Sequence, residues 1–417
     1  MRYRGIFAAA VLAAVAGATE AAALEYVPVY NMSFLGGQYF MQGSRGNLNG
    51  NVRAVAAPLL RRDSEWSFLP LYVGEYQGIK GVDDGVGAGT LYQQKMDHKA
   101  SFAALYTPRG GPWKLKPSLS YKREFLKETR DESWGRGLFD YEKLAMGFEA
   151  ENLYREPFSY RLGMDIYRIR FPNYQSLESN AGTDPQGNPL GRELASRNVL
   201  DTYNYQLSAS ASYPLPYEEP VMSLTAEYGF LYQDYHDQRL VDARGQLADQ
   251  SRRDFLQTVS MGATYPRPVQ VFGEACRLDS SLAFNFAYNG SNQNTYDASR
   301  TQFVGDSYSY YSAGGGPTFR MAWGDKKRPA MASLSMRYHH VAYLGRQAQD
   351  GDGIYSGSQQ WQDRYLLGLN YAYPIARGFY LKVQTNLLWE RSNQNYEKTY
   401  AYNYQTANYI MGFTYEY

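Results

Sequence analysis

The sequence contains one cysteine, Cys276, and four histidines in 417 residues. A single cysteine cannot form a disulfide within the chain, and it cannot build a cysteine-based metal cluster. The sequence also lacks an apolar run long enough for a membrane-spanning helix, and its mean hydropathy is −0.54, which excludes helical membrane proteins. Because the formal net charge is only +1, no overall basic field argues for nucleic acid as a partner.

Motifs for catalysis or for cofactor binding are lacking as well. No Ser/His/Asp arrangement, phosphate-binding loop or zinc-ligand spacing stands out, so we expect no catalytic residue, no cofactor, no metal and no enzyme activity. His339 and His340 are neighbours and would lie on opposite faces of a strand, where they cannot share one ion. The run Asp350-Gly351-Asp352-Gly353 resembles half of a calcium loop without the distal Glu, and we expect a solvated loop there.

The first residues have the pattern of a secretory signal peptide. Arg2 and Arg4 provide a positive start, an apolar stretch follows over 6–16, and small residues at 21–23 offer a cleavage site. We therefore expect residues 1–23 to be removed on export and residues 24–417 to form one domain. No cysteine lies near the cleavage site, so a lipoprotein anchor is not expected.

The rest of the chain is rich in tyrosine and glycine, with 41 and 39 residues, and its apolar residues recur at every second position. Over 202–213, Tyr, Leu and Ala occupy the odd positions, and mostly Asn, Gln and Ser occupy the even ones. Successive side chains of a strand point to opposite faces, so this pattern predicts one apolar, aromatic face and one polar face. Tyrosine suits a membrane–water interface because its ring is apolar and its hydroxyl is polar.

The same pattern recurs along the whole chain and predicts sixteen strands, at 29–41, 47–59, 64–77, 97–107, 113–126, 139–153, 157–170, 202–213, 220–234, 253–266, 275–289, 306–323, 330–344, 360–373, 376–391 and 404–417. Short turns with Pro or Gly alternate with mostly longer polar connections such as 171–201, 236–252 and 345–359. Bacterial barrels combine short periplasmic turns with longer extracellular loops in this way. We therefore predict an all-β fold, a transmembrane antiparallel up-and-down β-barrel.

Two soluble all-β folds are the alternatives, a pair of sandwiches or a propeller. No shift of composition divides the chain into two sandwiches, and no blade-length repeat supports a propeller.

The last predicted strand resembles the closing strand of bacterial outer-membrane β-barrels. Its apolar face ends on Phe413, Tyr415 and Tyr417, and these barrels carry a C-terminal aromatic residue that their assembly machinery reads. The resemblance implies that these three residues are an assembly signal and that the barrel-assembly machinery is a partner. It also implies location in the outer membrane of a Gram-negative bacterium, in contact with lipid and lipopolysaccharide.

More loosely, the last third of the chain is similar to the barrel domains of bacterial exopolysaccharide-export porins. The shared features are aromatic-rich strands, a Tyr-Pro-Ile-Ala-Arg-Gly turn over 373–378 and a Gly-Phe-Thr-Tyr run over 412–415. The resemblance implies a channel for hydrophilic solutes, with polysaccharide and periplasmic export proteins as partners. Such exporters can carry a tetratricopeptide region before the barrel, which we do not expect here. The alternative is a plugged structural or adhesive barrel that binds partners through its extracellular loops.

If the aromatic face meets lipid, the polar face lines the interior, and sixteen strands normally leave an aqueous channel. The residues that we expect to line the channel are Lys116, Lys122, Arg161, Asp165, Glu227, Arg320, Arg337, Arg364, Lys382 and Glu390. Because both signs share a confined space, we expect cross-strand ion pairs and no strong ion selectivity. In the same wall, the run Gly314–Gly316 predicts a plain bend, with a bulge or room for an inward-folded loop as alternatives.

A rim protease is the remaining alternative. The omptin proteases use an aspartate pair and an Asp-x-His arrangement, which Asp83-Asp84 and Asp234-Tyr235-His236 resemble. However, the phase of strand 220–234 places Asp234 and His236 on the outward face, and omptins have fewer strands. We therefore expect these residues to have no catalytic role.

Overall fold

The computed structural model describes residues 24–41, 47–78, 94–127, 132–152, 158–175, 194, 196–215, 221–271, 273–297, 300–397 and 402–417. The predicted signal peptide, residues 1–23, and the pair Asp83-Asp84 lie outside the described residues. All regular elements in the described part of the chain are strands. Within these ranges, no helix is long and apolar enough to cross a membrane.

Eighteen strands form one sheet, and two more form a separate hairpin. In chain order the strands are β1 (Glu25–Val27), β2 (Tyr30–Met41), β3 (Asn47–Ala56), β4 (Leu59–Arg61), β5 (Trp66–Gln77), β6 (Gln94–Tyr106), β7 (Trp113–Lys127), β8 (Tyr141–Asn152), β9 (Ser159–Arg170), β10 (Thr202–Leu215), β11 (Met222–Val241), β12 (Leu247–Val271), β13 (Glu274–Ser291), β14 (Thr295–Asp297), β15 (Gln302–Val304), β16 (Tyr310–Asp325), β17 (Arg328–Gln349), β18 (Tyr355–Ala376), β19 (Phe379–Ser392) and β20 (Tyr404–Glu416).

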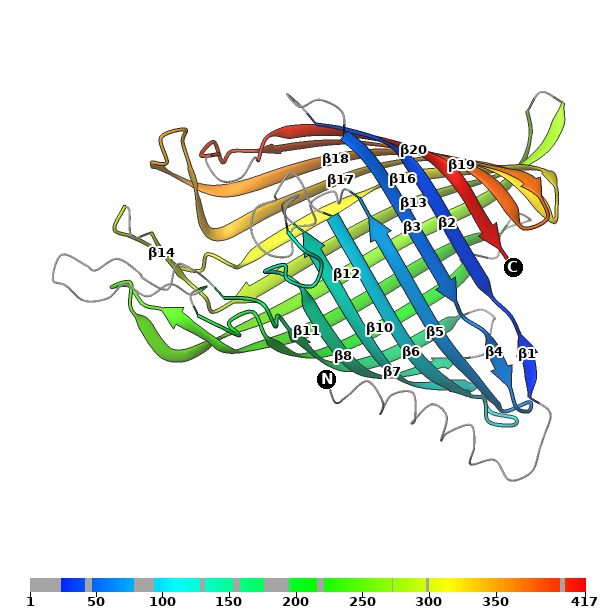
Figure 1. Ribbon diagram of the computed structural model, residues 1–417, viewed down its shortest axis with the longest axis horizontal. Helices are drawn as coiled ribbons and strands as arrows, with labels where there is room; N and C mark the ends of the chain where they lie inside the picture. Colours follow the sequence, from blue (N-terminus) through cyan, green and yellow to red (C-terminus); the bar gives the residue numbers. More distant parts are fainter. Residues whose placement is uncertain are drawn as a thin grey trace.

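The large sheet closes on itself and forms a barrel (Figure 1). Short β1 continues β2, and short β4 continues β3, because β1 pairs with β4 while β2 pairs with β3. The eighteen strand segments of the sheet therefore form a barrel of sixteen strands. All neighbours are antiparallel, and β20 pairs with both β19 and β2. This confirms the predicted fold class, an all-β antiparallel barrel with an even number of strands.

Both ends of the barrel wall lie at the same rim. The backbone N–H of Tyr30 donates to the carbonyl of Tyr417 at 3.1 Å, and the N–H of Tyr417 donates to the carbonyl of Tyr30 at 2.9 Å. We call this end the terminal rim and the opposite end, where β11 turns into β12, the distal rim. Of the predicted assembly-signal residues, Phe413 and Tyr415 lie in β20, which is hydrogen-bonded on both sides, and Tyr417 directly follows it and bonds to Tyr30.

The outer face is apolar over the middle of the wall. Met146, Met261 and Met411, on three different strands, are 61%, 59% and 58% exposed. Aromatic residues with similar exposure, such as Phe34 and Phe284, alternate with inward-facing neighbours in the same way. So large an exposed apolar surface is stable against lipid and not against water, so the predicted assignment of the faces fits the structure.

Two distal connections differ from their prediction. The polar stretches 236–252 and 345–359 were expected to be long loops, but most of their residues continue β11, β12, β17 and β18 beyond the regular ladder (Figure 1). Register shifts precede the pairs Arg239–Ser251 and Gln347–Gln359. Here the two strands of each hairpin pair with each other although their residues are polar, so composition alone wrongly indicated loops.

The turn between β17 and β18 contains the run that resembles half of a calcium loop, and a carboxylate of this run binds the backbone of the turn. One carboxylate oxygen of Asp350 accepts the N–H of Asp352 at 3.0 Å and the N–H of Ile354 at 2.9 Å. Asp350 itself is exposed. The prediction of a solvated loop is therefore confirmed.

We predict that closure of the barrel fails when a side chain is added to Gly37 of β2. A Cβ at this position would lie 1.8 Å from the carbonyl oxygen of Tyr409 on β20, a distance that real Cβ atoms do not reach. Gly37→Ala should therefore lose the folded, heat-modifiable band in SDS gel electrophoresis. The adjacent Gly36→Ala is the matched control, because its Cβ would lie 4.0 Å from the nearest atom. Equal folding of the two variants would contradict the close approach of β2 and β20.

Candidate functional site

The inner face can be traced residue by residue, because directly paired residues of an antiparallel ladder point to the same side. Since Met261 is exposed on the outer face, its neighbour Ser260 faces inward, together with all residues in register with it. From β9 to β19 this row consists of Arg161, Ser210, Glu227, Ser260, Asn285, Gly314, His339, Arg364 and Glu390. The row thus contains four of the ten residues that the sequence placed in the channel.

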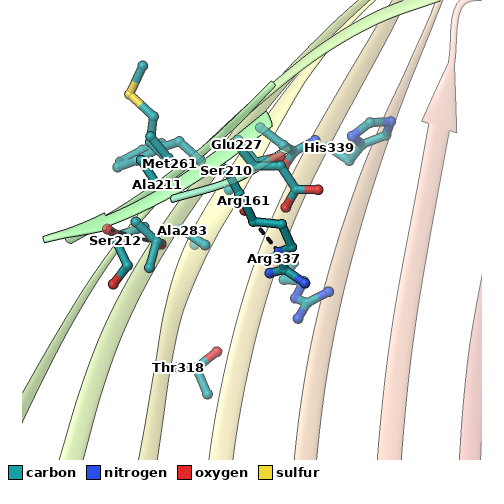
Figure 2. Close-up of a pocket in the computed structure, with 18 of the residues that line it drawn as sticks. Arg161, Ser210, Ala211, Ser212, Glu227, Met261, Ala283, Thr318, Arg337 and His339 are labelled. Atoms are coloured by element: carbon teal, nitrogen blue, oxygen red, sulfur yellow. Dashed lines mark hydrogen bonds between the residues drawn. The ribbon is translucent and has the colours of Figure 1, made fainter. Parts of the chain in front are cut away.

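A cavity of about 850 Å³ lies against this inner wall and is lined by Arg161, Glu227, Arg337 and Arg364. Figure 2 shows Arg161, Glu227 and Arg337 projecting into it from different strands. A smaller cavity of about 410 Å³, nearer the terminal rim, is lined by Arg320 and Lys382 together with the carboxylate of Glu416. Two cavities therefore collect six of the ten predicted residues.

Small side chains make room on the wall from β10 to β17. Hydroxyl residues line the large cavity there, namely Ser210, Ser212, Thr225, Ser260 and Thr318. At Gly316, φ is 156° and a Cβ would lie 2.0 Å from the carbonyl oxygen of Met336, so only glycine fits. The pairs Gly315–Tyr338 and Thr318–Ser335 keep one register, so the run of glycines does not form the bulge that was one of the alternatives. The sequence indicated only that these residues share a polar face. It did not indicate that they leave space for a cavity.

The wall from β6 to β7 carries charges that neutralise one another. The Nζ of Lys122 lies 2.9 Å from a carboxylate oxygen of Glu124, and the Nζ of Lys95 lies 2.9 Å from Asp97 and 3.4 Å from Glu124. Asp97 and Glu124 are buried. Sequence reasoning missed Lys95 because the predicted strand began at 97, whereas β6 begins at Gln94.

Lys116, Arg161 and Asp165 extend this charged wall to β9. The Nζ of Lys116 lies 2.6 Å from Glu149 and 2.7 Å from Glu151, and Arg161 lies 3.5 Å from Glu149. Asp165 occupies the space left by a glycine, since a Cβ at Gly147 would lie 2.2 Å from its Oδ1. The expected cross-strand ion pairs are thus present on this wall.

The facing wall, from β16 to β19, carries cations that are mostly without such partners. Lys382, Arg320, Arg337 and Arg364 lie inward at successive levels, which we call the cation ladder. The strand pairing gives each rung a level on β17. Lys382 is level with Met331, Arg320 with Ser333 and Arg364 with His339, while Arg337 is itself on β17. At about 3.3 Å per residue, they are spaced about 7, 13 and 7 Å apart from the terminal rim towards the distal rim.

Of the four cations, only Arg364, which lies nearest the distal rim, is paired with a carboxylate. The Nε of Arg364 lies 3.0 Å from a carboxylate oxygen of Glu390, which also accepts a hydrogen bond from the hydroxyl of Tyr404 at 3.1 Å. Among the residues that the structure describes, Arg320, Arg337 and Lys382 have no carboxylate within 4.0 Å. The ladder therefore presents positive charge to the lumen.

A stack of tyrosine and arginine side chains holds the distal rim together. The buried guanidinium of Arg252 lies between the rings of Tyr235 and Tyr308, at 4.3 and 4.2 Å from their centres. The guanidinium of Arg346 continues the stack over Tyr308 and over Tyr343, at 5.6 and 4.1 Å. These contacts join the β11–β12 hairpin to the β15–β16 connection and to β17. No local sequence signal indicated this cluster, because its members come from separate segments.

Farther from the wall, the separate β14–β15 hairpin contacts the extended β17–β18 hairpin. The hydroxyl of Tyr355 donates to a carboxylate oxygen of Asp297 at 3.0 Å. Burial, together with the negative charge of Asp297, raises the pKa of Tyr355 above its usual range. Tyr355 therefore remains a hydrogen-bond donor at neutral pH.

In the described part of the chain, neither the pair His339-His340 nor Asp234-Tyr235-His236 gathers into a site. His339 faces inward opposite Arg364, whereas the Nδ1 of His340 lies 2.7 Å from Asp363 on the outer face, so the two lie on opposite faces as predicted. Asp234 pairs with Tyr203 on the outer face, and the register shifts after Tyr235. In the described part of the chain, no group of three or more His, Cys, Asp or Glu residues could hold a metal ion.

The closed wall, its apolar outer face and its charged inner face define the class of the protein. The chain is a porin-like, sixteen-stranded antiparallel β-barrel of the transmembrane type.

No protein-family model matches the sequence, and no curated protein sequence matches it. Among solved structures, the chain is similar to Pseudomonas aeruginosa OccD3 (OpdP), with 8% identity over 95% of this chain and 93% of the other and a TM-score of 0.46. It is also similar to a bacterial polysaccharide outer membrane secretin, with 9% identity over 93% and 98% and a TM-score of 0.42. A third is a loop-deletion mutant of OmpT, an outer membrane protein of Vibrio cholerae, with 10% identity over 94% and 99% and a TM-score of 0.42.

We predict that Glu390→Gln destabilises the barrel by about 1–3 kcal/mol, because it leaves the largely buried Arg364 without its carboxylate. Urea unfolding of the refolded barrel in lipid vesicles, followed by tryptophan fluorescence, measures this change. Glu25→Gln is the matched control: its ion pair with Arg61 has the same length, 3.0 Å, but both side chains are about half exposed. This control should change stability little. A Glu390 variant as stable as the control would show that Arg364 does not depend on Glu390.

Proposed function

We propose that this chain is an outer-membrane channel for hydrophilic solutes, with both termini on the periplasmic side. The carrying observation is the large cavity against the inner wall, lined by ionised and hydroxyl side chains inside a closed barrel that is apolar outside. A barrel of sixteen strands is too wide for its side chains to fill the interior. Polar groups placed so are stable when water fills the lumen.

The lining favours solutes that carry negative charge and hydroxyl groups. The lower three rungs of the cation ladder offer positive charge at successive levels, and several weak sites in a row allow a solute to enter and to leave. The hydroxyl wall of β10–β17 can exchange hydrogen bonds with a sugar. The sequence analysis predicted no strong ion selectivity. The paired charges on β6–β9 agree with that prediction, whereas the cation ladder adds a modest preference for anions.

Within this proposal, an anionic polysaccharide is the first candidate cargo. The sequence resemblance to exopolysaccharide-export porins supports it, and export would then depend on separate periplasmic proteins. The barrel-assembly machinery would read Phe413 and Tyr415, on the outer face of β20, and Tyr417, which directly follows this strand. We propose no enzyme activity for this barrel.

The second candidate is a surface-binding barrel with a plugged lumen. It is favoured by the extended β11–β12 and β17–β18 hairpins, which the tyrosine–arginine stack holds in a fixed arrangement at the distal rim. Such a surface could bind a partner outside the cell. Conductance distinguishes the two candidates, because a plugged barrel passes no steady current.

We predict that the refolded protein forms steady channels in a planar bilayer with a modest preference for anions. Replacing two unpaired rungs, in Arg320→Gln with Arg337→Gln, should shift the reversal potential in a KCl gradient towards cations and weaken current block by acidic oligosaccharides. The charge-preserving variant, Arg320→Lys with Arg337→Lys, should behave as the unmodified protein. A silent barrel of confirmed fold would overturn the channel, and unchanged selectivity in the Gln variant would overturn the role of the ladder.

A further inference from the structure

The outer face carries four arginines near the distal rim, Arg123 of β7, Arg168 and Arg170 of β9, and Arg253 of β12, which we call the outer arginine patch. Arg168 is in register with Tyr203, and Tyr203 with Asp234, which is in register with Arg253. Arg123 and Arg170 are both in register with Glu142. Leu144, which pairs with Arg168, is 50% exposed, so this row points away from the lumen.

The patch lies at the edge of the apolar band. Going from Arg168 towards the terminal rim, the next three outward positions of β9 are Ile166, Met164 and Leu162, which are 38%, 46% and 50% exposed. On β12, Arg253 is followed on the same face by the exposed Phe255. An arginine next to such a surface sits where lipid headgroups meet acyl chains.

The ion pairs of the patch are long and leave donors available. Arg168 and Arg170 share one carboxylate oxygen of Asp201 at 3.7 and 3.8 Å, and Arg123 lies 3.9 Å from Glu142. These distances exceed hydrogen-bond length, whereas Arg252 at the same rim makes hydrogen bonds of 2.5–3.1 Å to Asp254. Arg253 has no ion pair among the described residues.

We propose that the outer arginine patch binds the phosphorylated headgroup of an anionic glycolipid in the outer leaflet, with its acyl chains on the apolar band below. The planar guanidinium groups match phosphate oxygens in charge and geometry. The patch extends over five inter-strand spacings, about 24 Å, which is wide enough for more than one phosphate. Glu142 and Asp201 hold Arg123, Arg168 and Arg170 in place. Together with Asp234, which is in register with Arg253, these carboxylates offset part of the positive charge of the patch. The proposal rests on the proposed outer-membrane location and not on channel activity.

The test measures binding of diphosphorylated lipid A, and of the same lipid after removal of its phosphates, to the folded full chain in detergent by native mass spectrometry. The variant Arg168→Gln with Arg170→Gln and Arg253→Gln should bind diphosphorylated lipid A at least about tenfold more weakly. Arg391→Gln is the matched control: Arg391 is an exposed arginine near the distal rim of β19, on another part of the wall, and its loss should leave binding unchanged. The unmodified protein should bind the phosphate-free lipid as weakly as the triple variant binds lipid A.

Equal affinity of the unmodified protein for the two lipids would overturn the proposal, and this comparison does not depend on the folding of a variant. An equal loss of binding in Arg391→Gln would also overturn it, because the effect would then be one of net charge. Tighter binding of a soluble acidic peptide than of lipid A would assign the patch to a protein partner. Conductance is measured separately, so a failed channel and a failed lipid site give different results.

Discussion

The structure depends on one constraint: a β-sheet in lipid must leave no backbone edge unpaired. An open edge would expose N–H and C=O groups to a medium that cannot hydrogen-bond them, so only a closed barrel is stable there. The pairing of β20 with β2 meets this constraint and brings both ends of the wall to the terminal rim. Glycines at 37 and 412 allow the two strands to approach, since a Cβ at either position would lie 1.8 Å from a carbonyl oxygen of the opposite strand.

Closure also decides how the charges are arranged. Once every second side chain must face lipid, the ionised residues are confined to the lumen, to the rims and to the border of the apolar band. On β6–β9 the confined charges neutralise one another at short distances, as Lys116 does with Glu149 and Glu151. On β16–β18, Arg320 and Arg337 have no such partners in the described residues, which is compatible with a water-filled lumen where an unpaired charge keeps its hydration. The two walls therefore differ in what they offer a solute, although the sequence shows both as polar.

The sequence predicted the strands and their faces well because period two is imposed by two different solvents on the two sides of the wall. The predicted strand 202–213 corresponds to β10, Thr202–Leu215, with the inward and outward residues as expected. The prediction failed at 236–252, because this hairpin continues β11 and β12 with polar residues and its burial no longer alternates: Gln238, Leu240 and Val241 are all buried. The stack around Arg252 and the pairing state of each lumen charge could not be predicted, since they depend on the register between strands.

The most direct test of the account is the alternation of faces around the large cavity. Because the chain has one cysteine, Cys276→Ser gives a cysteine-free background in which single cysteines can be placed on adjacent residues. In liposomes, Glu227→Cys and Ser260→Cys should react with a charged, membrane-impermeant thiol reagent, and the reaction should reduce the channel current. The neighbours Tyr228→Cys and Met261→Cys should remain unlabelled, because they face the acyl chains. The account would be contradicted if cysteines at the outward positions 228 and 261 reacted as fast as those at the inward positions 227 and 260, or if only the outward positions reacted.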